Sequence, residues 1–303
     1  MSVMGPKRAV EVHGMSWQAY QVVLRLRSPL HIGHSKVGNL QRTRPYVTGR
    51  GLWGALTMRL TRDAYLGHGP ATDSQQYHQF GDQVHSLLAF TYFYPAQKSN
   101  THDGYSVQWP WENESAFRRR FLSSHSGTAL SYPAQSATEG TLHEVEFISP
   151  LTLDTGEPVF LMGYMFEKEG NALKWQEAFQ RFQLGGERGY GWGDLELIGI
   201  QVATDQHLFG SSATFDGGGD QMRIHLPKDG RLLAHVVAEG LHVAGNVEPL
   251  VGREWQSNQP RNRYAGQHVG FSEVCFTPGS IAYDDLNLVV DRFGVWRASS
   301  ERR

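Results

Sequence analysis

The residues of this chain best suited to chemistry are the cations of an acid-free segment near its N-terminus. The 51 residues from Val12 to Arg62 contain no Asp or Glu, although the whole chain carries 30. The same segment holds eight cations: Arg25, Arg27, Lys36, Arg42, Arg44, Arg50, Arg59 and Arg62. Because no carboxylate of the segment can pair with them, these cations are expected to form a surface that attracts polyanions.

The residues between these cations favour a nucleic acid over a membrane as the polyanion. Glycines, amides and aromatic residues are interleaved with the charge, and such mixtures suit a phosphate backbone with bases to stack. We therefore predict RNA contacts from His31, Lys36, Asn39, Gln41, Arg42, Arg44, Tyr46, Arg50 and Arg59. Trp53 fits either a base contact or the core.

Two histidines of this segment could also do acid–base work. His31 and His34 carry imidazoles that titrate near neutral pH, which suits metal-independent RNA cleavage. The other interpretation is that they contact RNA or fix the loop. His68, His78 and His85 lack a carboxylate at metal-ligand spacing, and Cys275 is the single cysteine, so we predict neither a metal nor a cofactor.

A glycine-rich loop is the second strong feature. Five glycines occur within the nine residues 185–193, after an expected helix and before an expected strand. A dinucleotide fingerprint needs the opposite order, strand then helix. Glycine lets backbone N–H groups converge on an anion, so the loop is either an RNA contact or a structural turn. We predict contacts from Gly185, Gly186, Arg188, Tyr190 and Trp192.

Weaker candidates lie elsewhere. Arg253, Arg261 and Arg263 are interleaved with Trp255 and Tyr264, which is consistent with RNA or partner contact. The run Arg118–Arg120 is more typical of a solvated face. Glu144 and Glu146 share one face of an expected strand, where a structural role is favoured over acid–base catalysis.

Hydrophobic periodicity, together with capping residues and the glycines and prolines of turns, predicts the elements that position these residues. Apolar spacing predicts a helix that begins at Gly49 or Arg50 with Thr48 as its cap, and a second helix over 172–182 with Asn171 as its cap. The stretches 31–48 and 63–85 are expected to be loops. The expected strands are 20–27, 87–94, 144–149, 159–166 and 194–202.

This order predicts an α+β fold with a ferredoxin-like, RNA-recognition-like βαββαβ core over residues 17–202, with an insertion at about 96–142. Residues 203–303 are expected to form a β-rich C-terminal extension or a degenerate second ferredoxin-like unit. The formal net charge is −2, so a polyanion site must be local. No apolar run reaches the roughly 20 residues that span a bilayer, and we expect a cytoplasmic protein with no membrane contact.

Three motifs in this order resemble a known family. The segments Ser28–Gly33 (SPLHIG), Tyr46–Leu56 (YVTGRGLWGAL) and Gly185–Trp192 (GGERGYGW) resemble the first strand end, the entry to the first helix and the glycine loop of the repeat-associated mysterious protein (RAMP) superfamily, the RNA-binding subunits of CRISPR systems. The resemblance covers about 180 residues. It implies guide CRISPR RNA and other effector subunits as partners, with target RNA contacted indirectly.

Within that superfamily the resemblance leaves three roles open. Cleaving backbone subunits use an Asp in the loop after the first strand, and this sequence departs from them because residues 28–48 contain neither Asp nor Glu. With the extended C-terminal region, this favours a non-catalytic type III subunit that caps the 5′ handle of the guide. The alternatives are a backbone subunit along the guide and a guide-processing endoribonuclease that uses His31 or His34.

Overall fold

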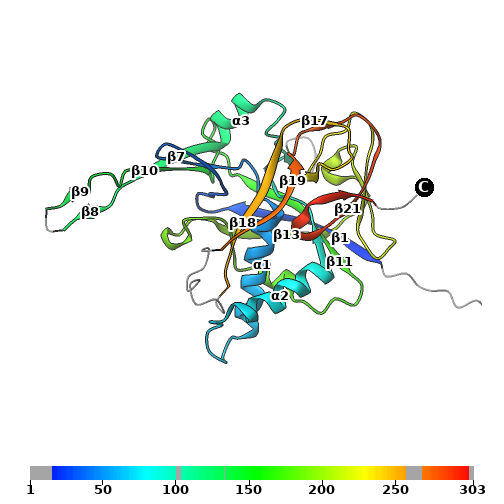
Figure 1. The fold of residues 1–303 in the computed structure, drawn as a ribbon, viewed down its shortest axis with the longest axis horizontal. Helices are drawn as coiled ribbons and strands as arrows, with labels where there is room; N and C mark the ends of the chain where they lie inside the picture. The colour runs from blue at the N-terminus through cyan, green and yellow to red at the C-terminus, as the bar shows by residue number, and fades with distance from the viewer. Residues whose placement is uncertain (1–15, 100–103, 133, 257–267, 300–303) are drawn as a thin grey trace, which may run out of the picture.

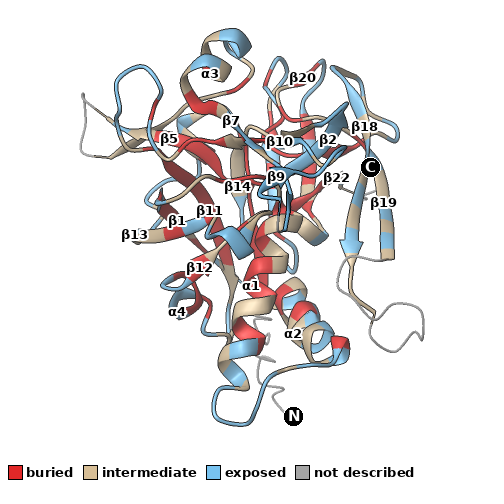
Figure 2. Ribbon diagram, turned by 90° about the vertical axis from the view of Figure 1, so that its left-hand side faces the viewer, coloured by how far each residue is buried: buried red, intermediate tan, exposed pale blue. Residues whose placement is uncertain are grey.

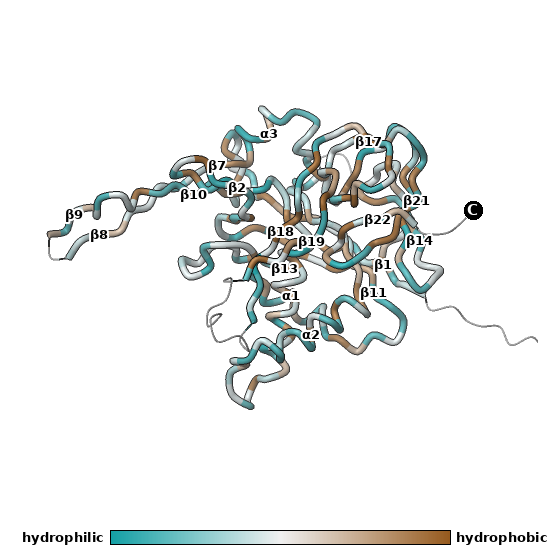
Figure 3. The backbone as a smooth tube through the Cα atoms, viewed as in Figure 1, coloured by the Kyte–Doolittle hydropathy of each residue, from teal (hydrophilic) through white to brown (hydrophobic). Residues whose placement is uncertain are grey.

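The computed structural model describes residues 16–99, 104–132, 134–256 and 268–299. The fold is mixed α+β and is dominated by two seven-stranded sheets and one four-stranded sheet (Figure 1). No helix among these residues is long and apolar enough to cross a membrane. Apolar segments concentrate along the central strands, whereas the arm that carries β8 (Leu130–Ser131) and β9 (Ser136–Ala137) mixes hydrophilic and hydrophobic residues (Figure 3).

The first sheet is built around β1, Trp17–Leu26, which pairs antiparallel with β11 on one side and β13 on the other. Alternate β1 residues such as Val22 and Leu24 are fully buried, as the period-two pattern predicts. The remaining members are β4 (Leu88–Phe90), β5 (Tyr94–Lys98), β6 (Tyr105–Val107), β11 (Phe160–Lys168), β12 (Phe182–Gln183) and β13 (Asp194–Val202).

Helix α1, Gly49–Ala64, packs on one face of this sheet through Leu52, Leu56 and Leu60. It begins where the sequence predicts, because Thr48 Oγ1 accepts a hydrogen bond from Gly51 N at 3.4 Å. Helix α4, Trp175–Phe179, packs in the same core. In Figure 2 the colour for buried residues occurs both in α1 and in the neighbouring strands β1 and β11.

The expectation that residues 63–85 form a loop is wrong, because they contain most of α2, Ser74–Leu87. Its start has a capping box in which the Asp73 side chain accepts from Gln76 N and Gln76 Oε1 accepts from Asp73 N, and Asp73 Oδ1 also accepts from Gln75 N. The sequence therefore contained the signal for this helix.

The strand expected over 87–94 is two strands, β4 and β5, with a break between them. At the break Thr91 Oγ1 accepts from Tyr164 N at 2.9 Å, so a side chain replaces the backbone partner. The helix expected over 172–182 is also shorter. Asn171 Oδ1 accepts from Leu173 N in a turn that precedes α4. Phe182 already belongs to strand β12, where it pairs with Leu195 of β13.

The four-stranded sheet holds the candidate RNA-binding segment. Residues 31–48 contain a β-hairpin rather than a loop, formed by β2, Gly33–Val37, and β3, Leu40–Thr43. Gly38 has a φ of +59° at the turn between them, a conformation that favours glycine. The sheet order is β2-β3-β10-β7, with β10 at His143–Ile148 and β7 at Leu122–Gly127.

The described part of the expected insertion at 96–142 is ordered into elements. It contains β6, the helix α3 (Glu114–Phe121), β7, and an arm tipped by β8 (Leu130–Ser131) and β9 (Ser136–Ala137). The arm projects from the body of the molecule (Figure 1).

The C-terminal region adds the second seven-stranded sheet, in the order β14-β15-β21-β22-β16-β19-β18. Tyr92, Tyr94 and Phe166 of the N-terminal region and Trp296 of the C-terminal region belong to one buried cluster, so the two regions share a core. The strands of this sheet are β14 (Thr214–Asp216), β15 (Arg223–Leu226), β16 (Val236–Val237), β18 (Val247–Glu254), β19 (His268–Phe276), β21 (Leu286–Val290) and β22 (Trp296–Ala298). A separate two-stranded sheet pairs β17 (Val243–Ala244) with β20 (Ile281–Ala282). Short 3-10 turns are η1 (Arg188–Tyr190), η2 (Leu208–Gly210) and η3 (Arg292–Gly294).

Candidate nucleic-acid interface

The glycine loop lies directly against the segment that follows β1. Gly193 N donates a hydrogen bond to Pro29 O at 2.8 Å, and Gly186 N donates to His31 O at 2.8 Å. Gly185 has a φ of +82°, and a Cβ there would lie 2.4 Å from His31 O. Glycine is therefore required for this approach, and the structure brings together two motifs more than 150 residues apart.

His31 is a buried member of this junction, with only 6 % of its surface exposed. Its Nδ1 lies 2.7 Å from Glu146 O. A carbonyl oxygen only accepts, so Nδ1 carries a proton and donates it to Glu146 O. His31 thus connects the glycine loop to strand β10.

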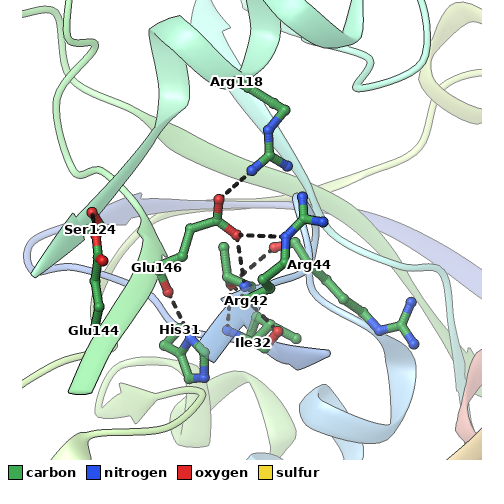
Figure 4. Close-up of polar contacts among 9 residues, drawn as sticks. His31, Ile32, Arg42, Arg44, Arg118, Ser124, Glu144 and Glu146 are labelled. Atoms are coloured by element: carbon green, nitrogen blue, oxygen red, sulfur yellow. Dashed lines mark hydrogen bonds and ion pairs between the residues drawn. The ribbon is translucent and has the colours of Figure 1, made fainter. Parts of the chain in front are cut away.

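Glu146 is the central carboxylate of this junction (Figure 4). Its Oε2 accepts from Thr43 N at 3.0 Å and lies 3.9 Å from Arg42 Nε, while Oε1 accepts from Arg118. Arg118 is therefore not only part of a solvated run, as the sequence suggested. Glu144, on the same strand, binds Ser124 instead.

The tip of the β2–β3 hairpin is the most open part of the acid-free segment. Lys36 and Asn39 are exposed, and a Cβ on Gly38 would meet nothing within 4 Å. No carboxylate of the described residues forms an ion pair with Lys36. Gln41, opposite Lys36 in the hairpin, is half-buried.

Arg44 of the same segment has the opposite environment. Its Nη1 donates to Glu248 Oε1 at 2.7 Å, and His235 Nε2 lies 2.6 Å from the same oxygen. Burial raises the pKa of Glu248, but hydrogen bonds from His235 and Arg44 outweigh it and lower the pKa to about 2. Burial lowers the pKa of His235 below its usual value. Tyr92 OH lies 2.7 Å from the other ring nitrogen, His235 Nδ1.

Arg50 and Arg59 are also paired. Arg50 Nη2 donates to Glu254 Oε1 at 2.6 Å and Nη1 to Ser272 Oγ at 3.2 Å. Arg59 Nη2 lies 2.7 Å from Asp63 Oδ1, one helical turn away. The segment has no carboxylate of its own, but carboxylates from outside it pair with Arg27, Arg42, Arg44, Arg50 and Arg59, so the expectation that its cations stay unneutralised is wrong for these five.

The aromatic candidates divide between the core and the surface. Tyr46 is 6 % exposed and stacks on Tyr92, and burial raises its pKa to about 12, so its ring offers no face to a base. Trp53 donates from Nε1 to Gly81 O at 3.0 Å and packs between α1 and α2. Trp192 is half-buried with its ring against Phe147.

The outer part of the glycine loop is exposed. Tyr190 is 84 % exposed, and Arg188 is exposed beside α1, where its Nη1 lies 3.2 Å from Met58 Sδ. Burial of part of its side chain and the nearby Arg62 lower the pKa of Arg188. A cation held beside a second cation favours an anionic ligand.

The remaining candidates are dispersed. Arg253 lies on β18 and is exposed, whereas Arg261 and Arg263 lie outside the described residues. No cluster of three or more metal-ligating side chains occurs in the described part of the chain. His85 stacks on Trp53 with ring centroids 5.1 Å apart, and burial lowers its pKa to about 4.

Comparisons with known proteins identify the family. The sequence profile of the RAMP superfamily matches residues 23–196, which are 174 of the 303 residues. The chain belongs to the RAMP superfamily. The match begins within β1 and ends within β13, so it contains the hairpin, α1 and the glycine loop of this RAMP.

No curated protein matches this RAMP sequence. Among solved structures, it is similar to a chain of the Type III-B Cmr-beta complex bound to cognate target RNA and AMPPnP, with 10 % identity, a TM-score of 0.46, and 86 % of this chain and 85 % of that chain covered. A chain of Cmr-beta bound to cognate target RNA matches with 11 % identity and a TM-score of 0.34, over 59 % of this chain and 96 % of that one.

Sequence reasoning missed the acidic partners of this RAMP's arginines. Glu248 and Glu254 are six positions apart in β18, and an even spacing places both on one face of a strand. This spacing could have indicated an acidic face from the sequence. Nothing local to either segment indicated that this face would meet Arg44 and Arg50. His235 carried no sequence signal of its own.

Proposed function

We propose that this RAMP is a structural subunit of a type III CRISPR effector complex that binds guide RNA and caps its 5′ handle, without catalysis of its own. The observation that carries the proposal is the docking of the glycine loop onto Pro29 and His31, next to an exposed basic hairpin. Two motifs that each suit RNA thereby form one continuous site in a member of an RNA-associated family.

Within this site we assign the RNA contacts to the exposed groups. Lys36 and Arg188 would meet phosphates, because neither forms an ion pair with a described carboxylate, while Asn39 and Tyr190 would meet sugar or base. Residues 28–48 contain no Asp or Glu, so the hairpin lacks the carboxylate with which backbone RAMPs would cut target RNA.

We further propose that residues 17–202 form a ferredoxin-like unit and residues 203–303 a β-rich extension. The order β13-β1-β11-β4 in an antiparallel sheet, with α1 after β1 and α4 after β11, supports the first assignment. Other effector subunits would be protein partners, target RNA would be met through the guide, and the complex would work in the cytoplasm.

A gel-shift experiment with end-labelled CRISPR repeat RNA in chelator tests this function. A shifted, uncut RNA is the expected result, and truncating the 5′ handle should abolish the shift while truncation of the 3′ end should not. Binding that ignores the 5′ end would instead assign the chain to the backbone of the complex. Absence of any shift would overturn RNA binding itself.

A pair of variants locates the contacts. The double variant Lys36→Ala, Arg188→Ala should reduce the slope of log Kd against log salt by about 1.4, because each single-strand phosphate contact contributes roughly 0.7. Lys228→Ala, an exposed cation of the C-terminal region, is the matched control and should keep the slope. An unchanged slope in the double variant would refute the assignment of these two cations.

The second candidate is a metal-independent endoribonuclease, and one observation favours it. In a neutral His31 imidazole whose Nδ1 donates to Glu146 O, Nε2 is the nitrogen that can accept a proton, as a general base requires. The low exposure of His31 argues against direct access to a ribose hydroxyl. A discrete cut product in the same gel, lost in His31→Ala or His34→Ala, would establish this function and displace the first.

A further inference from the structure

A pocket of about 340 Å³ lies where the basic segment meets the C-terminal sheet. Residues at the start of β2, at the start of α1, on β18 and β19, and in and just after η3 line it. This volume is within the range of small-ligand sites, which begin at roughly 300 Å³. His34, the second residue of β2, is one of the lining residues, so a strand of RNA that follows the hairpin would pass close to the pocket.

The polar side of the pocket contains an acceptor with unused capacity. Glu248 Oε1 is occupied by Arg44 and His235, whereas Oε2 accepts no hydrogen bond from the described residues and lies 3.8 Å from His34 Nδ1. The side chain of Glu248 is only 18 % exposed and keeps its charge, since its pKa is about 2. A half-buried carboxylate oxygen of this kind favours an N–H donor.

The other side of the pocket is apolar. Leu250, Phe293 and Val295 belong to one buried or partly buried cluster and line this wall. Phe293 is held in position by Trp53 and His85, whose rings meet it edge to face. Its φ of +61° is unusual for a residue with a side chain, so these contacts must fix it. The Arg50 guanidinium also lies over the Phe293 ring, with Cζ 4.6 Å from its centroid, so this wall combines apolar side chains with a guanidinium, and both suit a flat ring.

The charges of the pocket argue against a phosphate as its ligand. Arg44 pairs with Glu248 and Arg50 with Glu254, so the guanidinium charges are already matched one to one. A phosphate would meet the ionised Oε2 of Glu248 at close range and be repelled. A neutral ring with N–H donors on its edge meets both the apolar wall and the carboxylate favourably.

We propose that this pocket holds one nucleobase of the guide RNA and that Glu248 Oε2 accepts from the amino group of that base. The inference rests on the proposed RNA-binding function and deepens it, because it gives the site base selectivity. Bases with an amino group (adenine, guanine, cytosine) fit. Uracil is disfavoured because two carbonyl oxygens flank its single N–H and face the carboxylate.

An abasic scan of the repeat RNA tests the pocket. In wild-type protein, one abasic position is expected to weaken binding about tenfold, since a hydrogen bond to a charged group contributes about 1.5–3 kcal/mol. Leu250→Trp fills the pocket and should weaken binding of the intact RNA by a similar factor, with no further loss at that abasic position. Val269→Trp, on the exposed outer face of the paired strand β19, is the matched control and should bind as wild type.

A second variant keeps the proposal testable if Leu250→Trp fails to fold. Glu248→Gln keeps an oxygen for Arg44 and His235 and places an amide N–H₂ where Oε2 was. It should therefore reverse the preference at the sensitive position, from an amino-bearing base to uracil.

Wild-type binding that no abasic position changes would overturn the pocket and leave RNA binding intact. Unchanged base preference in Glu248→Gln would overturn the role of the carboxylate. If wild-type protein binds no repeat RNA at all, both the proposed function and the proposed role of the pocket are refuted.

Discussion

Two parts of the acid-free segment face opposite surroundings: the hairpin tip around Lys36, here called the exposed end, and the stretch from Arg44 to Arg50, here called the paired end. At the hairpin tip Lys36 is exposed, and within the described structure it has no carboxylate partner. Near the start of α1, Arg44 and Arg50 are half-buried and each pairs with a glutamate of β18 that lies 204 positions further along the chain. Cations of one sequence segment therefore serve two purposes. The exposed end is available to RNA, whereas the paired end joins the two regions of the protein.

This difference shows why a local excess of charge does not by itself identify a binding surface. A carboxylate that is distant in sequence can neutralise an arginine as effectively as a neighbour can. The exposure of the side chain and the position of its partner decide which cations remain free.

The largest effect should come from removing a paired cation. Arg44→Ala leaves the half-buried Glu248 without one of its two hydrogen-bonding partners and should lower the free energy of unfolding by about 3 kcal/mol. Lys36→Ala should change it by less than about 0.5 kcal/mol, as surface substitutions do. Urea denaturation of both variants measures the difference. Equal losses would erase the distinction between the two ends.

The pH dependence of stability should report the paired end. The pKa of Glu248 is about 2 in the folded protein against an ordinary value of 4.5. The contribution of Glu248 to the free energy of unfolding is complete above pH 4.5. As the pH falls from 4.5 toward 2, Glu248 is protonated in the unfolded chain before it is protonated in the folded protein, which favours unfolding. Up to about 3 kcal/mol should therefore be lost across that window.

Urea denaturation at a series of pH values measures this loss. Glu248→Gln should be less stable near neutral pH and show a flatter profile between pH 4.5 and 2. A parallel profile in the variant would mean that other carboxylates cause the acid loss. The buried His235, whose pKa lies below its usual value, should add a smaller loss as pH falls below 6.5.

The smallest effect concerns the glycine loop beside the exposed end. Gly185→Ala combines a φ of +82° with a clash against His31 O and should cost about 2 kcal/mol and weaken RNA binding. Gly189→Ala is the matched control, because a Cβ there would meet nothing within 4 Å. Thermal unfolding and the RNA gel measure both. If the two variants behave alike, docking of the loop does not position the site.

Local signals predicted some elements correctly. The cap at Thr48, the start of α1 and the bounds of β13 followed from residue type and periodicity, because caps and period-two burial depend on neighbours in sequence. The helix α2 was missed although Asp73 and Gln76 form its capping box. Its polar composition outweighed that signal, since only Ser74, Gly81 and Val84 are buried.

The candidate site was predicted in its parts but not in its arrangement. The glycine loop and the segment around His31 were each identified from composition. Their contact depends on Gly186 N reaching His31 O, which no local pattern encodes. The assignment of Tyr46 to a base failed because burial of an aromatic ring depends on what packs over it, here Tyr92.

The sequence by itself determined the family, the acid-free segment, the glycine loop and the elements whose signals are local. The tertiary structure alone decided which cations are paired, which aromatic rings are buried, and that a pocket forms between Arg44 and β18. The physical reason is range. Capping and periodicity act over a few residues, whereas ion pairing and burial depend on partners that only the folded chain brings within a few ångströms.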